Sequence, residues 1–149
     1  MGNSILVAWN DSMSCRAAIN YLVNLSMCPE YVNITLLHVF RKASASEELM
    51  GKTFTEEEEK RLADLLQKTK DDMIEKGFEP ENIHIKMVSE PYPTIAEGII
   101  DQFNKGNYDM VLLGRKRMSK AEEFVMGDIS IKLVRALDNA AVLVVRSSY

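Results

Sequence analysis

The sequence of 149 residues lacks the long apolar segments that membrane proteins and secreted precursors carry. No apolar run approaches the ~18 residues that a transmembrane helix needs. The N-terminal residues Met1–Ser4 lead directly into a short apolar run, without the basic region that opens a secretory signal. We therefore expect a cytoplasmic protein with no membrane partner.

Cysteine is scarce, and the chain has no excess of positive charge. The two cysteines, Cys15 and Cys28, lack the close spacing of a zinc or redox motif, and we expect reduced thiols packed as small apolar groups. With 22 acidic against 18 basic residues, the formal net charge is -4. A nucleic-acid-binding protein shows a basic footprint instead, so nucleic acid is not an expected partner.

Motifs of familiar catalytic sites are missing as well. No G-x-G-x-x-G follows the first apolar run, and neither G-x-x-x-x-G-K-[ST] nor the nucleophile elbow G-x-S-x-G occurs. The two histidines, His38 and His84, have no partner at helical spacing that would form a metal or general-base pair. The sequence thus predicts a protein that binds rather than catalyses, with no catalytic residue and no metal site.

What the chain does contain is five short apolar runs, at residues 5–9, 34–40, 83–88, 110–113 and 141–145. Four of them are nearly continuous in apolar residues, which is typical of strands buried on both faces of a parallel sheet. The run 83–88 differs, because Ile83, Ile85 and Met87 alternate with polar residues. This alternation predicts a half-exposed strand at a sheet edge.

Helical patterns separate these runs, which predicts one α/β domain over residues 1–149 with a parallel sheet and right-handed crossovers. Thr55 with Glu58 and Thr94 with Glu97 have the form of capping boxes at two helix starts, and a last helix is expected to begin near Asp128. The expected buried stripes are Ala18, Tyr21, Leu22 and Leu25; Leu62, Leu65, Leu66, Thr69 and Met73; Ala96, Ile99, Ile100 and Phe103; and Ile129, Leu133, Val134 and Leu137.

A basic cluster follows the fourth apolar run directly. Arg115, Lys116, Arg117 and Lys120 are either an ordinary solvated loop or an anion contact, and their place favours the second reading, because open α/β sheets bind ligands beyond the carboxyl ends of their strands. A glycine stands at each end of the loop, at 114 and 127, where backbone N–H groups could curl into an anion-binding nest. The loop is therefore the first candidate for a phosphate site.

The segment from Gly114 to Leu133 resembles the nucleotide loop of the universal stress protein family, whose ATP-binding members carry G-x2-G-x9-G-[ST]. The likeness extends over the chain, through Ile5–Ser12, Leu37–Val39, Pro93–Gly114 and Ala141–Val145. It implies a three-layer, doubly wound, five-stranded parallel sheet of order 3-2-1-4-5, the adenine-nucleotide alpha-hydrolase-like fold. It also implies a stress or signalling role without enzymatic activity, and a site between strands one and four.

The departures from that motif bear on nucleotide binding. The spacing places Arg117 at the second glycine and Asp128 at the Ser/Thr, and Asn10 stands where the family has an acidic residue. Losing the hydroxyl removes a hydrogen bond to a charged group worth about 1.5 to 3 kcal/mol. A carboxylate near phosphate adds repulsion of about 1 to 4 kcal/mol. Asp128 also has a purely structural explanation, because Asp caps a helix as well as Ser does.

Two interpretations of the site therefore stay open. In the first, the loop is degenerate and binds ATP weakly or not at all. In the second, the site binds ATP (with Mg²⁺), AMP or another phosphorylated metabolite. Under the second, the resemblance implies that Gly114 and Gly127 shape the nest, that Arg115, Lys116 or Arg117 neutralises phosphate, and that Asn10 and Val39 border the base.

Two further expectations concern the last strand and Trp9. Ala141–Val145 is wholly apolar, yet the implied strand order leaves it at an edge, where an uncovered apolar strand invites aggregation. A homodimer that pairs this strand with its own copy about a two-fold axis would cover it. Trp9 ends the first, central strand, so we expect a buried indole beside the candidate site.

Overall fold

The computed structural model describes residues 3–25, 28–41, 52–117, 119–122 and 128–147. Five parallel strands form one sheet in the order β3-β2-β1-β4-β5, as predicted. Ile5, in the middle strand, has Ile34 and Met110 as its neighbours on the two sides. The strands are β1 (Asn3–Ala8), β2 (Val32–Arg41), β3 (Ile83–Tyr92), β4 (Met110–Arg115) and β5 (Ala141–Arg146).

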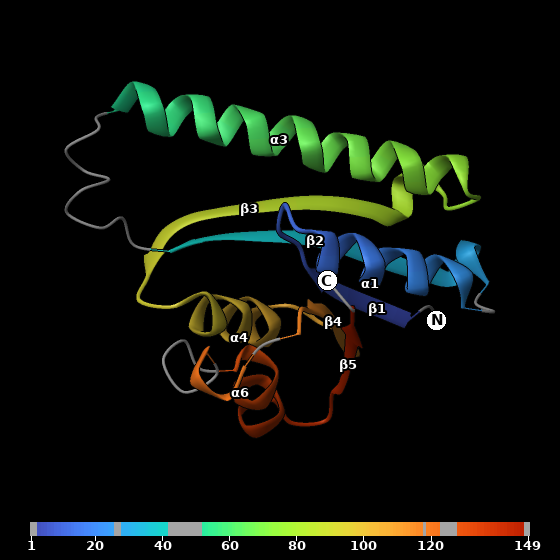
Figure 1. The fold of residues 1–149 in the computed structure, drawn as a ribbon. Helices are drawn as coiled ribbons and strands as arrows, with labels where there is room; N and C mark the ends of the chain where they lie inside the picture. Colours follow the sequence, from blue (N-terminus) through green and yellow to red (C-terminus); the bar gives the residue numbers. More distant parts are fainter. Residues whose placement is uncertain (1–2, 26–27, 42–51, 118, 123–127, 148–149) are drawn as a thin grey trace.

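In the described part of the chain, two helices cover each face of the sheet (Figure 1). On one face, α1 (Met13–Asn24) and α3 (Lys52–Glu75) pack against Ile5 and Val7. On the other face, α4 (Ile95–Lys105) and α6 (Ile129–Ala136) pack against Leu6. Successive side chains of a strand point to opposite faces, so the continuous apolar run of β1 fills both cores. Short 3-10 turns, Pro29–Tyr31 and Pro80–Asn82, lead into β2 and β3.

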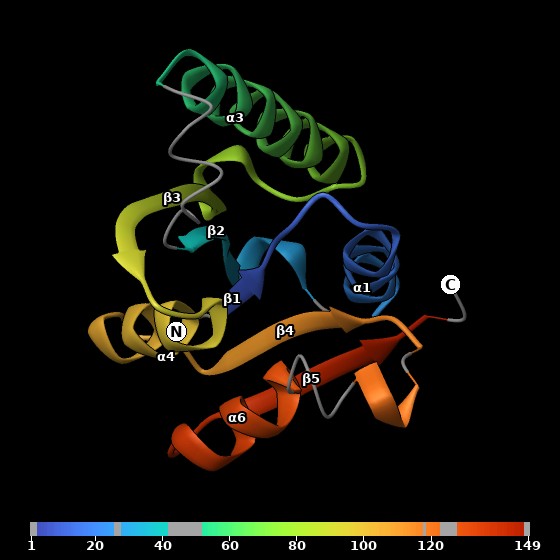
Figure 2. The same ribbon diagram turned by 60° about the vertical axis from the view of Figure 1, so that its left-hand side comes forward.

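The two edge strands, β3 and β5, lie at opposite sides of the sheet (Figure 2) and differ in the burial of their side chains. In β3, Ile83 is buried while His84 and Lys86 are exposed, which confirms the predicted edge strand. At the opposite edge, the side chains from Val142 to Val145 in β5 are only half-buried. The apolar edge expected from the sequence is therefore present in the single chain.

The helix starts agree with the sequence in two of three places. The Thr94 hydroxyl accepts the N–H of Glu97 at 3.2 Å and caps α4, and Asp128 caps α6. The start predicted at Thr55 is wrong, because α3 already begins at Lys52. Glu58 lies inside that helix and pairs with Arg61, one turn further along, at 2.6 Å.

Most of the predicted buried stripes are confirmed, with three errors. Tyr21 is 49% exposed, Val134 63% and Ile129 36%. In α1 the buried face runs instead through Cys15, Ala18, Ile19 and Leu22, and Tyr21 points away from it. In α6 the buried positions are Ser130 and Leu133, followed by Leu137 at the helix end, and the two misassigned residues flank this narrow stripe.

The cysteines take separate roles. Cys15 packs in the core as expected, and burial raises the pKa of its thiol to about 11. Cys28 is exposed, so the expectation of a packed thiol is wrong there. In the described part of the chain, His, Cys, Asp and Glu side chains do not gather in the threes that hold a metal ion. None of the helices described is long and apolar enough to cross a membrane.

Candidate functional site

Three of the residues singled out in the sequence meet at the carboxyl ends of β1 and β4, where the strand order of the sheet reverses direction. Asn10 follows β1, Val39 lies in β2 and Gly114 lies near the end of β4, and all three line one cavity. Parallel strands present their carboxyl ends at the same edge of the sheet, which is why positions so far apart in the sequence come together. The cavity measures about 70 Å³, well below the about 300 to 1,000 Å³ of common small-molecule pockets.

Apolar side chains from both layers narrow this switch-point cavity. Ile95 and Ile99 of α4 and Ile129 of α6 line it from one side, and Trp9 lines it from the β1 side. Ile129 contributes here although it is partly exposed. Its place at the cavity wall explains why the apolar residue falls outside the buried stripe of α6.

Gly114 is required by backbone packing. A Cβ at this position would collide with the Ser14 carbonyl oxygen and come within 2.8 Å of the Cys15 nitrogen. The end of β4 therefore lies directly against the first turn of α1. This glycine has a structural function that does not depend on any bound phosphate.

Asp128 is engaged within the protein on both carboxylate oxygens. Its Oδ1 accepts the backbone N–H of Ser130 at 3.0 Å and the Ser130 hydroxyl at 2.5 Å. Its Oδ2 lies 2.8 Å from a guanidinium nitrogen of Arg115. Burial by itself would raise the pKa of Asp128, but the Ser130 hydroxyl, the Arg115 charge and the helix amides together hold that pKa below its ordinary value. Asp128 is thus a charged helix cap with its own counterion.

The rest of the basic cluster does not converge on the cavity. Arg115 is directed to Asp128, whereas Lys116, Arg117 and Lys120 are exposed. None of these last three lines the cavity at the switch point. Gly127, the second glycine proposed to shape the nest, lies outside the described residues.

The turn after β1 carries a hydroxyl cluster that the sequence argument missed. The Ser12 hydroxyl accepts the backbone N–H of Cys15 at 3.1 Å and caps α1. It also donates to the Asn10 amide oxygen and lies 3.0 Å from the Ser14 hydroxyl. Part of the hydrogen-bonding capacity of Asn10 is therefore used by its own loop. The sequence did contain a signal for this cap, because Ser12 stands directly before the first helical residues, where a serine hydroxyl can accept a backbone N–H of the first turn.

Trp9 is buried beside the candidate site, as predicted, with 6% of its surface exposed. Its indole N–H donates to the Thr69 hydroxyl of α3 at 3.3 Å. The ring of His38 lies edge-on to Trp9 and Phe40, with ring centroids 5.7 and 4.5 Å away. Burial lowers the pKa of His38 below its usual value, so the imidazole is neutral at pH 7 and offers no positive charge to a phosphate.

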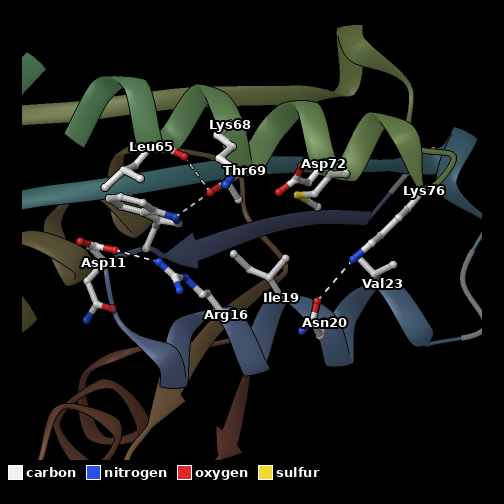
Figure 3. Close-up of a pocket in the computed structure, with 13 residues that line it drawn as sticks. Asp11, Arg16, Ile19, Asn20, Val23, Leu65, Lys68, Thr69, Asp72 and Lys76 are labelled. Atoms are coloured by element: carbon white, nitrogen blue, oxygen red, sulfur yellow. Dashed lines mark hydrogen bonds and ion pairs between the residues drawn. The ribbon is translucent and has the colours of Figure 1, made fainter. Parts of the chain in front are cut away.

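A second, larger cavity lies between α1 and α3 on one face of the sheet (Figure 3). Its volume is about 300 Å³, and it shares Trp9 and Asn10 with the smaller one. This cavity could not be predicted from the sequence, because its walls come from two helices about fifty residues apart and from no local motif. The described residues thus form two neighbouring cavities around the end of β1.

The strand order and the helices on both faces define a doubly wound α/β domain. A family model described as the universal stress protein family matches residues 1–146. The chain belongs to the universal stress protein family.

Solved structures of this fold cover nearly the whole chain at low sequence identity. The universal stress protein UspA from Lactobacillus plantarum has a TM-score of 0.72 at 17% identity, covering 97% of both chains. A family protein from Arabidopsis thaliana with AMP bound has a TM-score of 0.68 at 16% identity, covering 98% of this chain and 92% of that one. A universal stress protein in complex with cAMP has a TM-score of 0.65 at 11% identity, covering 98% of both. A comparison of the sequence with curated proteins found no match.

Proposed function

We propose that the chain is a non-enzymatic, cytoplasmic stress-response or signalling protein, homodimeric, whose nucleotide loop binds ATP weakly or not at all. The observation that carries this proposal is the ion pair between Arg115 and Asp128, 2.8 Å long, at the motif's Ser/Thr position. A phosphate placed there would meet a carboxylate instead of a hydroxyl. It would also compete for Arg115 with a partner that the fold already supplies.

Charge and space act in the same direction. The side chain of Asp128 is only 8% exposed, so its repulsion of a nearby phosphate is poorly screened by water. The cavity at the switch point, about 70 Å³, is too small for an adenine nucleotide unless its apolar walls move. Both observations support the proposal that this loop binds ATP weakly or not at all.

Calorimetric titration with Mg-ATP tests the proposal. We expect no saturable heat below about 1 mM, because the lost hydroxyl and the added carboxylate together remove several kcal/mol at about 1.4 kcal/mol per tenfold in affinity. Mass spectrometry of small molecules released from the denatured protein should find no stoichiometric nucleotide. A micromolar dissociation constant for Mg-ATP would overturn the proposal.

The second candidate function is binding of AMP or another phosphorylated metabolite. It is supported by the meeting of Asn10, Val39 and Gly114 at one cavity. Lys116 and Arg117 are exposed and could neutralise a phosphate outside it. Titration with AMP in the same calorimeter separates the two: saturable binding of AMP without binding of Mg-ATP favours this candidate.

The proposed homodimer follows from the edge position of β5. Ala141 is exposed, and the four residues after it are half-buried and apolar, so the strand offers both unpaired backbone groups and apolar surface. Pairing of β5 with its copy about a two-fold axis satisfies both. We place the dimer interface there.

Val144→Lys is expected to convert the dimer into a monomer at tens of micromolar, because each copy would bring a lysine ammonium into the proposed apolar interface. Sedimentation velocity measures the change, and far-UV circular dichroism checks that the variant is folded. Tyr31→Lys is the matched control, since Tyr31 is 62% exposed and lies before β2, away from β5. A monomeric parent protein, or a dimer that Val144→Lys leaves intact, would contradict the assignment.

A further inference from the structure

The groove between α1 and α3 is a second cavity with walls of its own. Figure 3 shows α3 on one side and α1 on the other, with β1 passing behind. The volume of about 300 Å³ lies at the lower end of the range of small-molecule pockets. Among the described candidate site residues named from the sequence, Asn10 alone lines it, next to Trp9.

Polar contacts fix the groove at both ends and in the middle. At one end the Lys76 ammonium of α3 donates to the Asn20 amide oxygen of α1 at 3.4 Å. In the middle the Trp9 indole is held by the Thr69 hydroxyl, whose own proton goes to the Leu65 carbonyl oxygen at 2.9 Å. At the other end, the Arg16 guanidinium lies 3.3 Å from Asp11. Of these contacts, the one between Lys76 and Asn20 joins the two helices directly, whereas the others tie the end of β1 to α3 and the loop after β1 to α1.

The inner part of the groove is apolar. Trp9, Ile19 and Met73 line it, with 6%, 8% and 1% of their surfaces exposed, and Val23 and Leu65 line it half-buried. An apolar group placed against these side chains leaves water at a gain proportional to the area covered. This part of the groove suits the body of a small organic molecule.

The rim of the groove is more basic than acidic. The rim carries three basic side chains and two acidic ones: Arg16, Lys68 and Lys76, and Asp11 and Asp72. Asp11 also forms an ion pair with Arg61 of α3, at 2.9 Å. The carboxylate is therefore divided between two guanidinium groups and neutralises the charge of Arg16 only in part.

On α3, Asp72 lies one turn from a lysine in each direction, which leaves that wall with a net positive charge. Lys68 has no ion-pair partner among the residues that the structure describes. Its charge is thus available at the groove.

We propose that this groove binds a small organic anion with an apolar body. The anionic group, a carboxylate or a phosphate monoester, is held by Arg16 and Lys68 at the rim. The apolar body lies inside against Ile19, Met73 and the Trp9 indole. The planar guanidinium of Arg16 can donate two parallel hydrogen bonds to either anion. The groove shares Trp9 and Asn10 with the switch-point cavity, but Arg16, Lys68, Ile19 and Met73 line the groove alone.

Three probes test the chemistry: 4-phenylbutyrate, phenyl phosphate and the neutral 4-phenylbutanol. Trp9 is the only tryptophan, so its fluorescence reports each titration. Amide shifts in a two-dimensional NMR spectrum then locate the bound probe. We expect saturable binding of at least one anionic probe, with shifts at Ile19, Val23 and Met73. The neutral alcohol should bind about tenfold more weakly or not at all, because it has no charge for the rim.

Paired variants separate the groove from general electrostatics. Arg16→Gln with Lys68→Gln should weaken binding of the anionic probe about tenfold, since two partly exposed cations are lost. Lys132→Gln with Arg135→Gln makes the same charge change on exposed positions of α6 and should leave binding unchanged. Val23→Phe, which fills the groove from α1 without adding a second tryptophan, should abolish binding, and urea unfolding confirms that each variant is folded.

The outcomes divide cleanly. Groove-confined shifts that depend on Arg16 and Lys68 support the proposal, and the ratio of phenylbutyrate to phenyl phosphate affinity tells which anion the site prefers. Shifts centred on Val39 and Gly114 would assign the probe to the switch-point cavity and overturn the inference. Equal binding of the neutral alcohol, or the absence of saturable binding by both anions, would overturn it as well.

Discussion

Gly114→Ala is expected to destabilise the protein by about 3 kcal/mol, at the upper end of the usual range for overpacking a tight site. The added methyl group would collide with the Ser14 carbonyl oxygen, which is part of the α1 backbone. Gly114 is also held in register opposite Val145 of β5, so the strand cannot retreat without losing its pairing. Neither side of the collision can move cheaply.

Gly98→Ala is the control for this substitution. Its Cβ would collide with the Val39 Cγ1 and come within 2.9 Å of the Tyr92 ring, but both obstacles are side chains. The change also gains about 1 kcal/mol of helix propensity within α4. We expect a loss of less than half that of Gly114→Ala. Urea unfolding followed by Trp9 fluorescence compares the two, and a stable Gly114→Ala variant would show that the glycine is dispensable for packing.

Arg117→Gly combined with Asp128→Ser is expected to raise the affinity for Mg-ATP at least about tenfold over the parent protein. The serine restores a hydroxyl donor, removes a like charge and still caps α6. It also releases Arg115 from the 2.8 Å ion pair, so this guanidinium becomes available to phosphate. Among the described non-glycine residues only Asn139 has a positive φ, so Arg117 does not adopt this conformation. Glycine at position 117 makes a positive φ accessible there.

Four proteins in one calorimetric series resolve the contributions: the parent, the two single variants and the pair. Each single change should help less than the pair, because both act on the same phosphate. Arg117→Gly with Asp128→Asn serves as a further control, since Asn keeps the cap and removes the charge without supplying a hydroxyl. Equal or weaker ATP binding by the double variant would mean that the loop is shaped for something other than ATP.

The sequence by itself determined the strand and helix order and the edge position of β3. A continuous apolar run buries all its side chains only in a strand that is covered on both faces. The alternation from Ile83 to Met87 buries its apolar side chains with one face covered. Local chemistry also sufficed for the caps at Thr94 and Asp128, because a cap is made by a side chain and a backbone N–H two or three residues away.

Only the tertiary structure decided which side chains meet across large separations in the chain. An apolar stripe in the sequence is wider than the strip of helix that touches the sheet, so Tyr21 and Val134 could not be told apart from their buried neighbours. The partner of Asp128 is set by where β4 ends relative to α6, and the groove of Arg16 and Lys68 by the distance at which α3 crosses α1. These distances follow from packing of the whole domain, because no local pattern encodes the separation of two helices that are far apart in the sequence.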